Sequence, residues 1–290
     1  MALQTKYAGD NSGRGPSQGI WSDCPWLEIV ADPSKGTTYW DDFMSFGGRL
    51  AITDDAEAVT ANIHSYPSDG GSWTVGQIDG LALVPPTTAP ANAEYGWFPG
   101  ALAATDNIAF VAKLGGLLAT QMQITKVTGK KFWFEAAVQF SQIAAAQNFF
   151  IGFAEENLPA ATALGIFSNA GVLSDKDMLG FAIRADGTST VEAVHNTAGG
   201  GGTVDNGDIA TIVAATPVKL GIKYERSGRD GERLGFYRGG VEILAVGASV
   251  IGAATFPSAQ RMAMYIAGTN GSAAVKNMHV DWARFCQLSS

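Results

Sequence analysis

The short segment Gly15-Pro16-Ser17-Gln18-Gly19 matches the G-x-S-x-G pattern that carries the nucleophilic serine of many hydrolases. That serine works only at a sharp turn between a buried strand and a helix. Here a Gly- and Ser-rich stretch precedes the pattern and a Trp-rich segment follows it, so neither element is indicated. We therefore expect a loop, and we predict no catalytic role for Ser17.

Carboxyl pairs that could cleave a glycosidic bond are the next candidates. Glycoside hydrolases need two carboxyl groups facing one cleft, and β-sandwich glucanases place them at alternate positions of one strand, as E-x-D-x-E. No such run is present, because Glu135, Glu242 and Asp281 each stand alone in an apolar stretch. Asp41 and Asp42 are adjacent, so they point to opposite sides of an extended chain. The sequence therefore predicts that the protein is not an enzyme.

Metal and cofactor motifs are equally weak. His64, His195 and His279 are too far apart in sequence to suggest a zinc site. The oxygen-rich segment Asp205-Asn206-Gly207-Asp208 could ligate calcium, but its spacing is not that of an EF-hand and such segments are more often plain turns. No Gly-rich phosphate-binding pattern is found. We predict neither a metal nor a cofactor, and calcium at 205–208 stays open.

The chain has two cysteines, Cys24 and Cys286, which are too few for a disulfide framework. They could meet if the N-terminal segment lay beside the last strand. In a reducing compartment two ordinary thiols are the default. Whether the two cysteines pair stays open.

Acidic residues are concentrated in the first third of the chain. Residues 1–110 hold 13 acidic and 4 basic residues, and the whole chain has a net charge of -8. An acidic surface repels phosphate backbones, so it disfavours nucleic acid and suits a basic protein partner. We expect no membrane partner and no secretion, because no apolar run could span a bilayer and the start lacks a signal-peptide core.

The candidate residues described above lie in or between short segments that the sequence predicts to be β-strands. In residues 131–140, KFWFEAAVQF, alternate apolar side chains from Phe132 to Phe140 predict a half-buried strand. NFFIGFAEE indicates a central strand covered on both faces. Asp186-Gly187-Thr188 and Gly239-Gly240 favour tight hairpins, because glycine accepts positive φ. Further strands are expected in MLGFAIR, TVEAVH, VKLGIKYE, RLGFYR, VEILAV, RMAMYIAG and VKNMHVDWARF.

This pattern, with little helix, predicts an all-β protein built on an antiparallel β-sandwich with jelly-roll-like connections. We expect the sandwich domain to span residues 116–290, with a long flexible loop over 199–208. Residues 46–115 are expected to form an irregular, partly stranded segment that wraps the sandwich. Residues 1–45 are expected to form an extended N-terminal arm.

The segment from Trp21 to Phe43 carries most of the aromatic residues of this arm. Pro25 and Pro33 exclude a long helix or a central strand there. Its aromatic side chains either cover their own sandwich or bind a neighbouring subunit, and both interpretations stay open. The residues that we predict for partner binding are Trp21, Trp26, Leu27, Tyr39 and Trp40.

A carbohydrate-binding surface would need an exposed aromatic platform with polar neighbours. Trp133 is the best candidate, since it lies on the face of its strand opposite the Phe132 to Phe140 row. The competing interpretation is that the N-terminal segments bury it.

The segments FWFEAAVQF, FFIGFAEEN, VKLGIKYE, GFYRGGVEIL and VDWARF resemble successive strands of the concanavalin A-like (laminin-G-like) sandwich, over residues 130–290. That fold serves lectins, enzymes and structural modules alike. The Gly- and Ser-rich start followed by GIWSDCPWLEIVADPSKGTTYWDDF is similar to the layout of capsid decoration, or cement, proteins of tailed bacteriophages.

The second resemblance implies a non-enzymatic virion structural protein, which binds the outer capsid lattice and bridges neighbouring capsomers. It implies a homotrimer, the major capsid protein as partner, and a place on the capsid surface after assembly in the host cytoplasm. The alternative is a carbohydrate-binding, lectin-like phage tail or host-attachment module.

Overall fold

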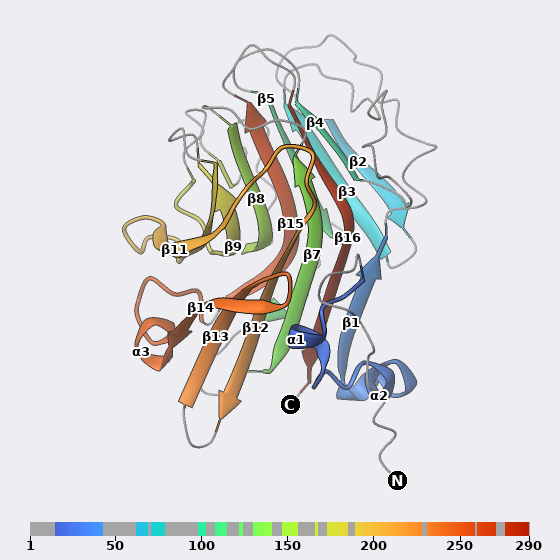
Figure 1. Ribbon diagram of the computed structural model, residues 1–290, viewed down its shortest axis with the longest axis vertical. Coiled ribbons are helices and arrows are strands. Elements are labelled where there is room, and N and C mark those ends of the chain that lie inside the picture. The colour runs from blue at the N-terminus through green and yellow to red at the C-terminus, as the bar shows by residue number, and fades with distance from the viewer. Residues whose placement is uncertain are drawn as a thin grey trace.

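Two antiparallel sheets packed face to face make up the protein (Figure 1). The predicted antiparallel β-sandwich is therefore confirmed. The computed structural model describes residues 15–42, 62–68, 71–78, 98–102, 108–114, 122–123, 130–140, 147–155, 166–167, 173–184, 189–227, 231–258, 260–270 and 276–289. The expected turn residues 186–188, Phe43 and much of the expected segment 46–115 lie outside these ranges.

The seven-stranded sheet has the order β1-β16-β7-β12-β13-β14, and β4 also pairs with β16. First and last strands of the chain thus lie side by side, since β1 pairs with β16. The strands are β1 (Gly36–Asp41), β4 (Phe98–Leu102), β7 (Phe132–Phe140), β12 (Val218–Ser227), β13 (Gly231–Arg238), β14 (Val241–Gly247) and β16 (Lys276–Leu288).

The nine-stranded sheet has the order β11-β10-β9-β8-β15-β5-β3-β2, and β6 pairs with β15. Residues 46–115 thus supply strands to both sheets, while the division of the chain into three parts stays a prediction. The strands are β2 (Asn62–Ser68), β3 (Gly71–Ile78), β5 (Ile108–Leu114), β6 (Met122–Gln123), β8 (Gln147–Glu155), β9 (Met178–Ile183), β10 (Thr190–Asn196), β11 (Val204–Thr211) and β15 (Arg261–Asn270).

The main core lies between the sheets and is rich in aromatic rings. Phe153 of β8 makes edge or tilted contacts with three rings of the opposite sheet, at centroid distances of 5.9 Å to Phe132, 5.0 Å to Phe134 and 5.2 Å to Phe285. Such buried rings contribute roughly 1.5–3 kcal/mol each through removal of apolar area from water. Alternation within β7 and β12 places their inward residues as the sequence predicts.

The prediction of a half-buried strand at 131–140 is wrong on one point. All nine residues of β7 are buried, so its outward face is covered as well as its inward face. β8, by contrast, is covered on both faces as expected, with Phe149 in the main core and Phe150 in a second cluster. The cover over β7 comes from the N-terminal segment.

Glycine and Asx turn signals correctly predicted the β13–β14 hairpin but gave a loop where the structure has strand β11. Gly239 and Gly240 have φ of 55° and 78°, and they join β13 to β14 as expected. The expected flexible loop over 199–208 is wrong in its second half, because residues 205–208 belong to β11 and pair with β10 across two register shifts. Inter-strand hydrogen bonds overrode the turn preference of Asp205-Asn206-Gly207-Asp208.

The prediction of an extended N-terminal arm is not confirmed for residues 15–42. Residues 15–35, which we name the N-terminal strap, contain α1 (Gln18–Trp21), α2 (Trp26–Ala31) and the 3-10 turn η1 (Pro33–Lys35), and residues 36–41 are β1. Figure 1 shows α1 against β7 and α2 beside β1, in agreement with the element contacts. An aromatic-rich segment is stabilised by burying its rings on the nearest apolar face, here that of its own sheet.

The strap fits because a glycine lies beneath it. Ile20 of α1 is fully buried, and its Cδ1 lies 2.3 Å from the position that a Cβ on Gly221 of β12 would occupy. Any side chain at Gly221 would therefore push Ile20 off the sheet. The outward face of β12 is thus shaped to accept the strap.

We expect Gly221→Ala to destabilise the protein by roughly 1–3 kcal/mol through overpacking against Ile20. The measurement is the urea midpoint followed by tryptophan fluorescence. Gly247→Ala is the matched control, because nothing lies within 4 Å of its Cβ position. Equal midpoints for the two variants would contradict this account of the strap.

Candidate functional site

A cluster of polar side chains lies where β9 begins and β10 ends, at one end of these two strands of the nine-stranded sheet. We name Asp175, Asp177, Asn196 and Thr197 the rim cluster, together with Thr203, which directly precedes Val204, the partner of His195 in the pairing of β11 with β10. Asn196 Nδ2 donates to Asp175 Oδ1 at 2.9 Å. The backbone N–H groups of residues 198 and 199 donate to Asp177 Oδ1 at 2.9 Å and to Asp175 Oδ2 at 3.1 Å. The two carboxylates therefore hold the start of the 197–203 loop.

Glycines give this loop a shape that other residues rarely adopt. Gly199, Gly201 and Gly202 have φ of 78°, 93° and 119°, and a Cβ at any of them would meet no atom within 4 Å. Positive φ favours glycine, while the open space around these positions leaves the backbone accessible. A ligand could approach the loop closely there.

Three buried oxygen atoms of the rim cluster have no hydrogen-bond partner among the described residues. They are Asn196 Oδ1, Thr197 Oγ1 and Thr203 Oγ1. Asn196 itself is fully buried, and its amide is oriented by Asp175. Buried polar atoms without partners are costly, so they are typical of positions that water or a ligand completes.

Burial also acts on one carboxylate of the cluster. It raises the pKa of Asp177, and the nearby charges of Glu155 and Asp175 act in the same direction, while the Ala198 N–H and Lys176 oppose them. Lys176 is itself paired with Glu155 at 2.8 Å. The rim therefore contains carboxylate and amide acceptors rather than a concentration of positive charge.

His195 precedes the cluster but points to the other face of β10. Its ring lies 5.1 Å from that of Phe256, and Nδ1 lies 2.9 Å from Asn206 Nδ2, which can only donate. Nδ1 is thus the acceptor, and Nε2 carries the proton. Burial lowers the pKa of His195, which favours the neutral form of the ring. We assign it a packing role.

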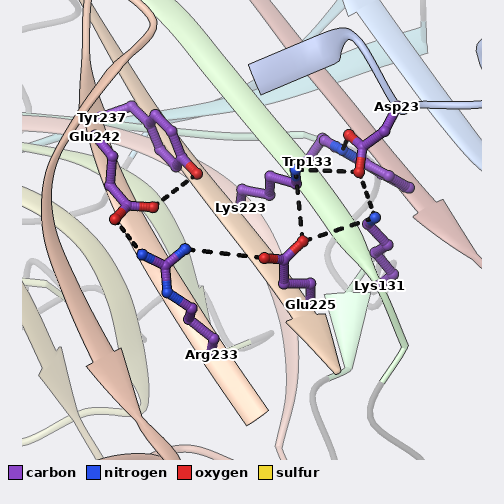
Figure 2. Close-up of polar contacts among 8 residues, drawn as sticks. All are labelled: Asp23, Lys131, Trp133, Lys223, Glu225, Arg233, Tyr237 and Glu242. Atoms are coloured by element: carbon purple, nitrogen blue, oxygen red, sulfur yellow. Dashed lines mark hydrogen bonds and ion pairs between the residues drawn. The ribbon is translucent and has the colours of Figure 1, made fainter. Parts of the chain in front are cut away.

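A second polar network covers part of the outer face of the seven-stranded sheet, the face turned away from the other sheet (Figure 2). Asp23 accepts from Trp133 Nε1 at 3.0 Å and pairs with Lys131 at 2.5 Å and Lys223 at 3.1 Å. Burial alone would raise the pKa of Asp23, but these donors hold it below its ordinary value. The network anchors the strap.

The network continues across β12, β13 and β14. Glu225 lies 3.5 Å from Lys223 and 3.8 Å from Arg233. Arg233 is ion-paired with Glu242, which also accepts from the Tyr237 hydroxyl at 3.0 Å. Acids and bases alternate and neutralise each other, so this surface has the character of a structural network.

Trp133 is not a sugar platform. Its side chain is fully buried under the strap, in a cluster with Ile20, Trp21 and Ile29. The competing interpretation of the sequence, burial by the N-terminal segments, is the one observed. A carbohydrate could not stack on this ring.

Glu135 is the most enclosed carboxyl group of the outer face. Its Oε2 accepts from Ser17 N and from Trp21 Nε1, both at 2.8 Å. Lys219 Nζ donates to the Gly15 carbonyl at 3.0 Å and holds the same end of the strap. Glu135 and Ser17 thus meet, but as a clamp on the strap, with the Ser17 side chain fully buried.

The five residues predicted for partner binding divide into two groups. Trp21 and Tyr39 are buried, Trp21 against Glu135 and Tyr39 in the main core. Leu27 and Trp40 are 56% and 42% exposed. Trp26 is partly buried and shares a cation with Trp40, because the Arg284 guanidinium lies 5.5 Å and 5.3 Å from the two ring centres. The predicted partner role itself stays a prediction.

Residues 205–208 offer no preformed calcium cage. Asp205 accepts from Gly207 N at 2.8 Å and pairs with Arg184 at 2.9 Å. Within the described ranges, His, Cys, Asp and Glu side chains are nowhere grouped in threes as metal ligands would be. No helix of the described part is long and apolar enough to cross a membrane.

The rim cluster is the site that sequence reasoning missed. Its signal is faint: Asn196 and Thr197 precede the glycine run at 199–202, and Asp175 and Asp177 alternate in Ser-Asp-Lys-Asp. The two segments are 21 residues apart along the chain, as the Asn196–Asp175 hydrogen bond records. Only the pairing of β9 with β10 brings them together.

No protein-family model and no curated protein matches the chain. The fold is similar to the carbohydrate recognition domain of Emp47p, with a TM-score of 0.51, 12% identity, and coverage of 88% of this chain and 97% of that one. Peanut lectin has a TM-score of 0.46 at 14% identity, covering 88% of this chain and 99% of the lectin. An endo-1,3-beta-glucanase from Streptomyces sioyaensis has 0.45 at 16%, covering 89% and 98%.

Together with the two-sheet topology, the likeness to the Emp47p domain identifies the fold as a concanavalin A-like β-sandwich, as the sequence predicts. At such low identity they define a class of fold and leave the function to be argued from the site.

The Glu135 clamp should make stability depend on pH. Burial raises the pKa of Glu135 above its ordinary 4.5, although Ser17 and Trp21 donate to it. A raised pKa means that the folded state holds the proton more tightly, so its stabilisation is complete below the unfolded pKa and is lost as pH rises through the folded pKa. The urea midpoint of the wild type should therefore fall relative to that of Glu135→Gln as the pH rises above the ordinary carboxyl pKa of 4.5.

Glu28→Gln serves as the control, since Glu28 is an exposed acid on the same strap. It should reproduce the wild-type pH profile. Parallel profiles for wild type and Glu135→Gln would show that the clamp does not titrate in this range.

Proposed function

We propose that the protein is a non-catalytic, lectin-like carbohydrate-binding module and that the rim cluster is its binding site. The observation that carries this proposal is the set of partnerless buried oxygens, Asn196 Oδ1, Thr197 Oγ1 and Thr203 Oγ1, beside an open glycine loop.

The chemistry of the cluster suits a neutral polyhydroxyl ligand. A sugar hydroxyl both donates and accepts a hydrogen bond, as the two threonine hydroxyls do, while the amide oxygen of Asn196 and the aspartates accept. The carboxylates Asp175 and Asp177 disfavour a phosphate or another anion. The positive-φ glycines let a bulky ring reach the backbone.

The fold supports the same proposal to a limited degree. The similar domain of Emp47p is described as a carbohydrate recognition domain. Two of the acids considered for catalysis have structural partners: Glu135 clamps the strap, and Glu242 pairs with Arg233 and Tyr237. Binding without turnover is the function that this arrangement favours.

Thr203→Val tests the site without removing a structural contact. The Thr203 hydroxyl has no partner among the described residues, so its loss should leave the urea midpoint unchanged or slightly higher. A glycan array would identify a ligand of the wild type, and calorimetric titration should then show about tenfold weaker binding for Thr203→Val, the effect of one lost hydrogen bond.

Thr216→Val is the matched control, because the Thr216 hydroxyl already contacts the Ala214 carbonyl at 3.4 Å and Thr216 lies outside the rim cluster. It should keep full affinity. Binding of no glycan, or equal affinity of the two variants and the wild type, would contradict the proposal.

A second candidate is the virion structural role, favoured by one specific observation. Leu27 and Val30 of α2 and Trp40 of β1 are 56%, 57% and 42% exposed, and exposed apolar side chains of this size suit a protein partner. In this role the chain would be a trimer that binds the major capsid protein on the capsid surface.

The double variant Leu27→Ser/Val30→Ser would test the second role by co-sedimentation with assembled phage heads. We expect loss of at least about tenfold in affinity with an unchanged fold, since both side chains are exposed. Val213→Ser/Val241→Ser, at 61% and 58% exposure outside the strap, is the control. Equal co-sedimentation of both variants would contradict a role for α2.

A further inference from the structure

The thiols of Cys24 and Cys286 meet on the outer face of the seven-stranded sheet. Cys286 lies in β16, in register with Trp133 of β7 and Thr38 of β1. Cys24 follows α1, and the side chain of its neighbour Asp23 accepts from the Trp133 indole at 3.0 Å. Cys24 packs against the buried cluster that contains Cys286, and Cys286 is the neighbour that acts most strongly on the pKa of Cys24.

Apolar side chains surround this pair. Ile20, Trp21 and Ile29 of the strap close over it, Cys286 is fully buried and Cys24 is partly accessible. The contact with Cys286 and then burial raise the pKa of Cys24. Because the thiolate is the reactive form, the pair exchanges slowly while the strap is in place.

We propose that Cys24 and Cys286 form a cross-linking site, at which a disulfide fastens the N-terminal strap to the C-terminal strand β16. Both thiols are free in the structure, so this is the reduced form. The oxidant would be a low-molecular-weight disulfide. One cysteine thiolate attacks it and releases the first thiol. The thiolate of the second cysteine then attacks the cysteine sulfur of the mixed disulfide, which forms the Cys24–Cys286 bond and releases the second thiol. Both electrons and both protons leave with the two small thiols.

The bond would act on a segment that otherwise depends on non-covalent contacts. Ser17 and Trp21 donate to Glu135, and Lys219 holds the Gly15 carbonyl, all at the α1 end of the strap. At the other end Ser289 N donates to the Lys35 carbonyl at 2.8 Å, so strap and C-terminus already lie together. A disulfide in the middle would close a very long loop, which is where cross-links restrict the unfolded chain most.

The experiment uses the full chain incubated with oxidised or reduced glutathione. We expect thiol titration of the denatured protein to fall from two thiols to none, with the mass of the monomer reduced by two hydrogens and a Cys24–Cys286 linked peptide after digestion. The melting temperature of the oxidised protein should rise by about 5 °C or more and return on reduction.

Cys24→Ala and Cys286→Ala are the controls, and the first is the safer variant because Cys24 is only partly buried. Each variant should have a melting temperature near that of the reduced wild type, and oxidised glutathione should not raise it. Two persisting thiols, glutathione adducts alone, or cross-linked dimers would overturn the proposal. A Cys24→Ala protein that still gained stability with oxidised glutathione would overturn it equally.

Discussion

The outer face of the seven-stranded sheet carries an apolar patch formed by Trp133, Tyr237 and Cys286, and covering this patch is the constraint on which the rest of the structure depends. Trp133 and Cys286 project from that face and would lose their shelter without the N-terminal strap. Burial of apolar side chains stabilises the strap on the sheet, and the hydrogen bonds from Ser17 and Trp21 to Glu135 fix the position of the strap. The buried carboxyl is costly by itself, so it is accommodated only because Ser17 and Trp21 donate to it.

The same constraint separates the structural part of the molecule from the surfaces that remain available for binding. Rings that the strap places against the sheet, such as Trp21, cannot also anchor a partner. Leu27 of the strap and Trp40 of β1 stay exposed, so both side chains could contact a partner. The rim cluster is independent of the strap, because it belongs to the nine-stranded sheet. The two candidate functions of the protein therefore use different surfaces, the rim cluster for a sugar and the exposed side chains of α2 and β1 for a capsid partner.

Much of the fold was predictable from local pattern, and the site was not. Alternation in β12 and the Gly239-Gly240 turn predicted strands and a hairpin, because side-chain period and backbone φ are properties of adjacent residues. Local pattern failed for residues 205–208, where pairing with β10 determined the conformation. It also failed for Asn196 and Asp175, since a hydrogen bond between two segments leaves no periodic trace in either.

The sequence by itself determined the class of fold, because the alternation of apolar residues in successive strands and the glycine turns are readable along the chain. Only the tertiary structure decided that Trp133 is a buried partner of the strap, that Cys24 lies against Cys286, and that partnerless oxygens gather beside the glycine loop. The physical reason is that burial and hydrogen-bond satisfaction depend on what packs against a residue. An aromatic side chain on the outward face of a strand looks the same in sequence whether solvent or another segment covers it.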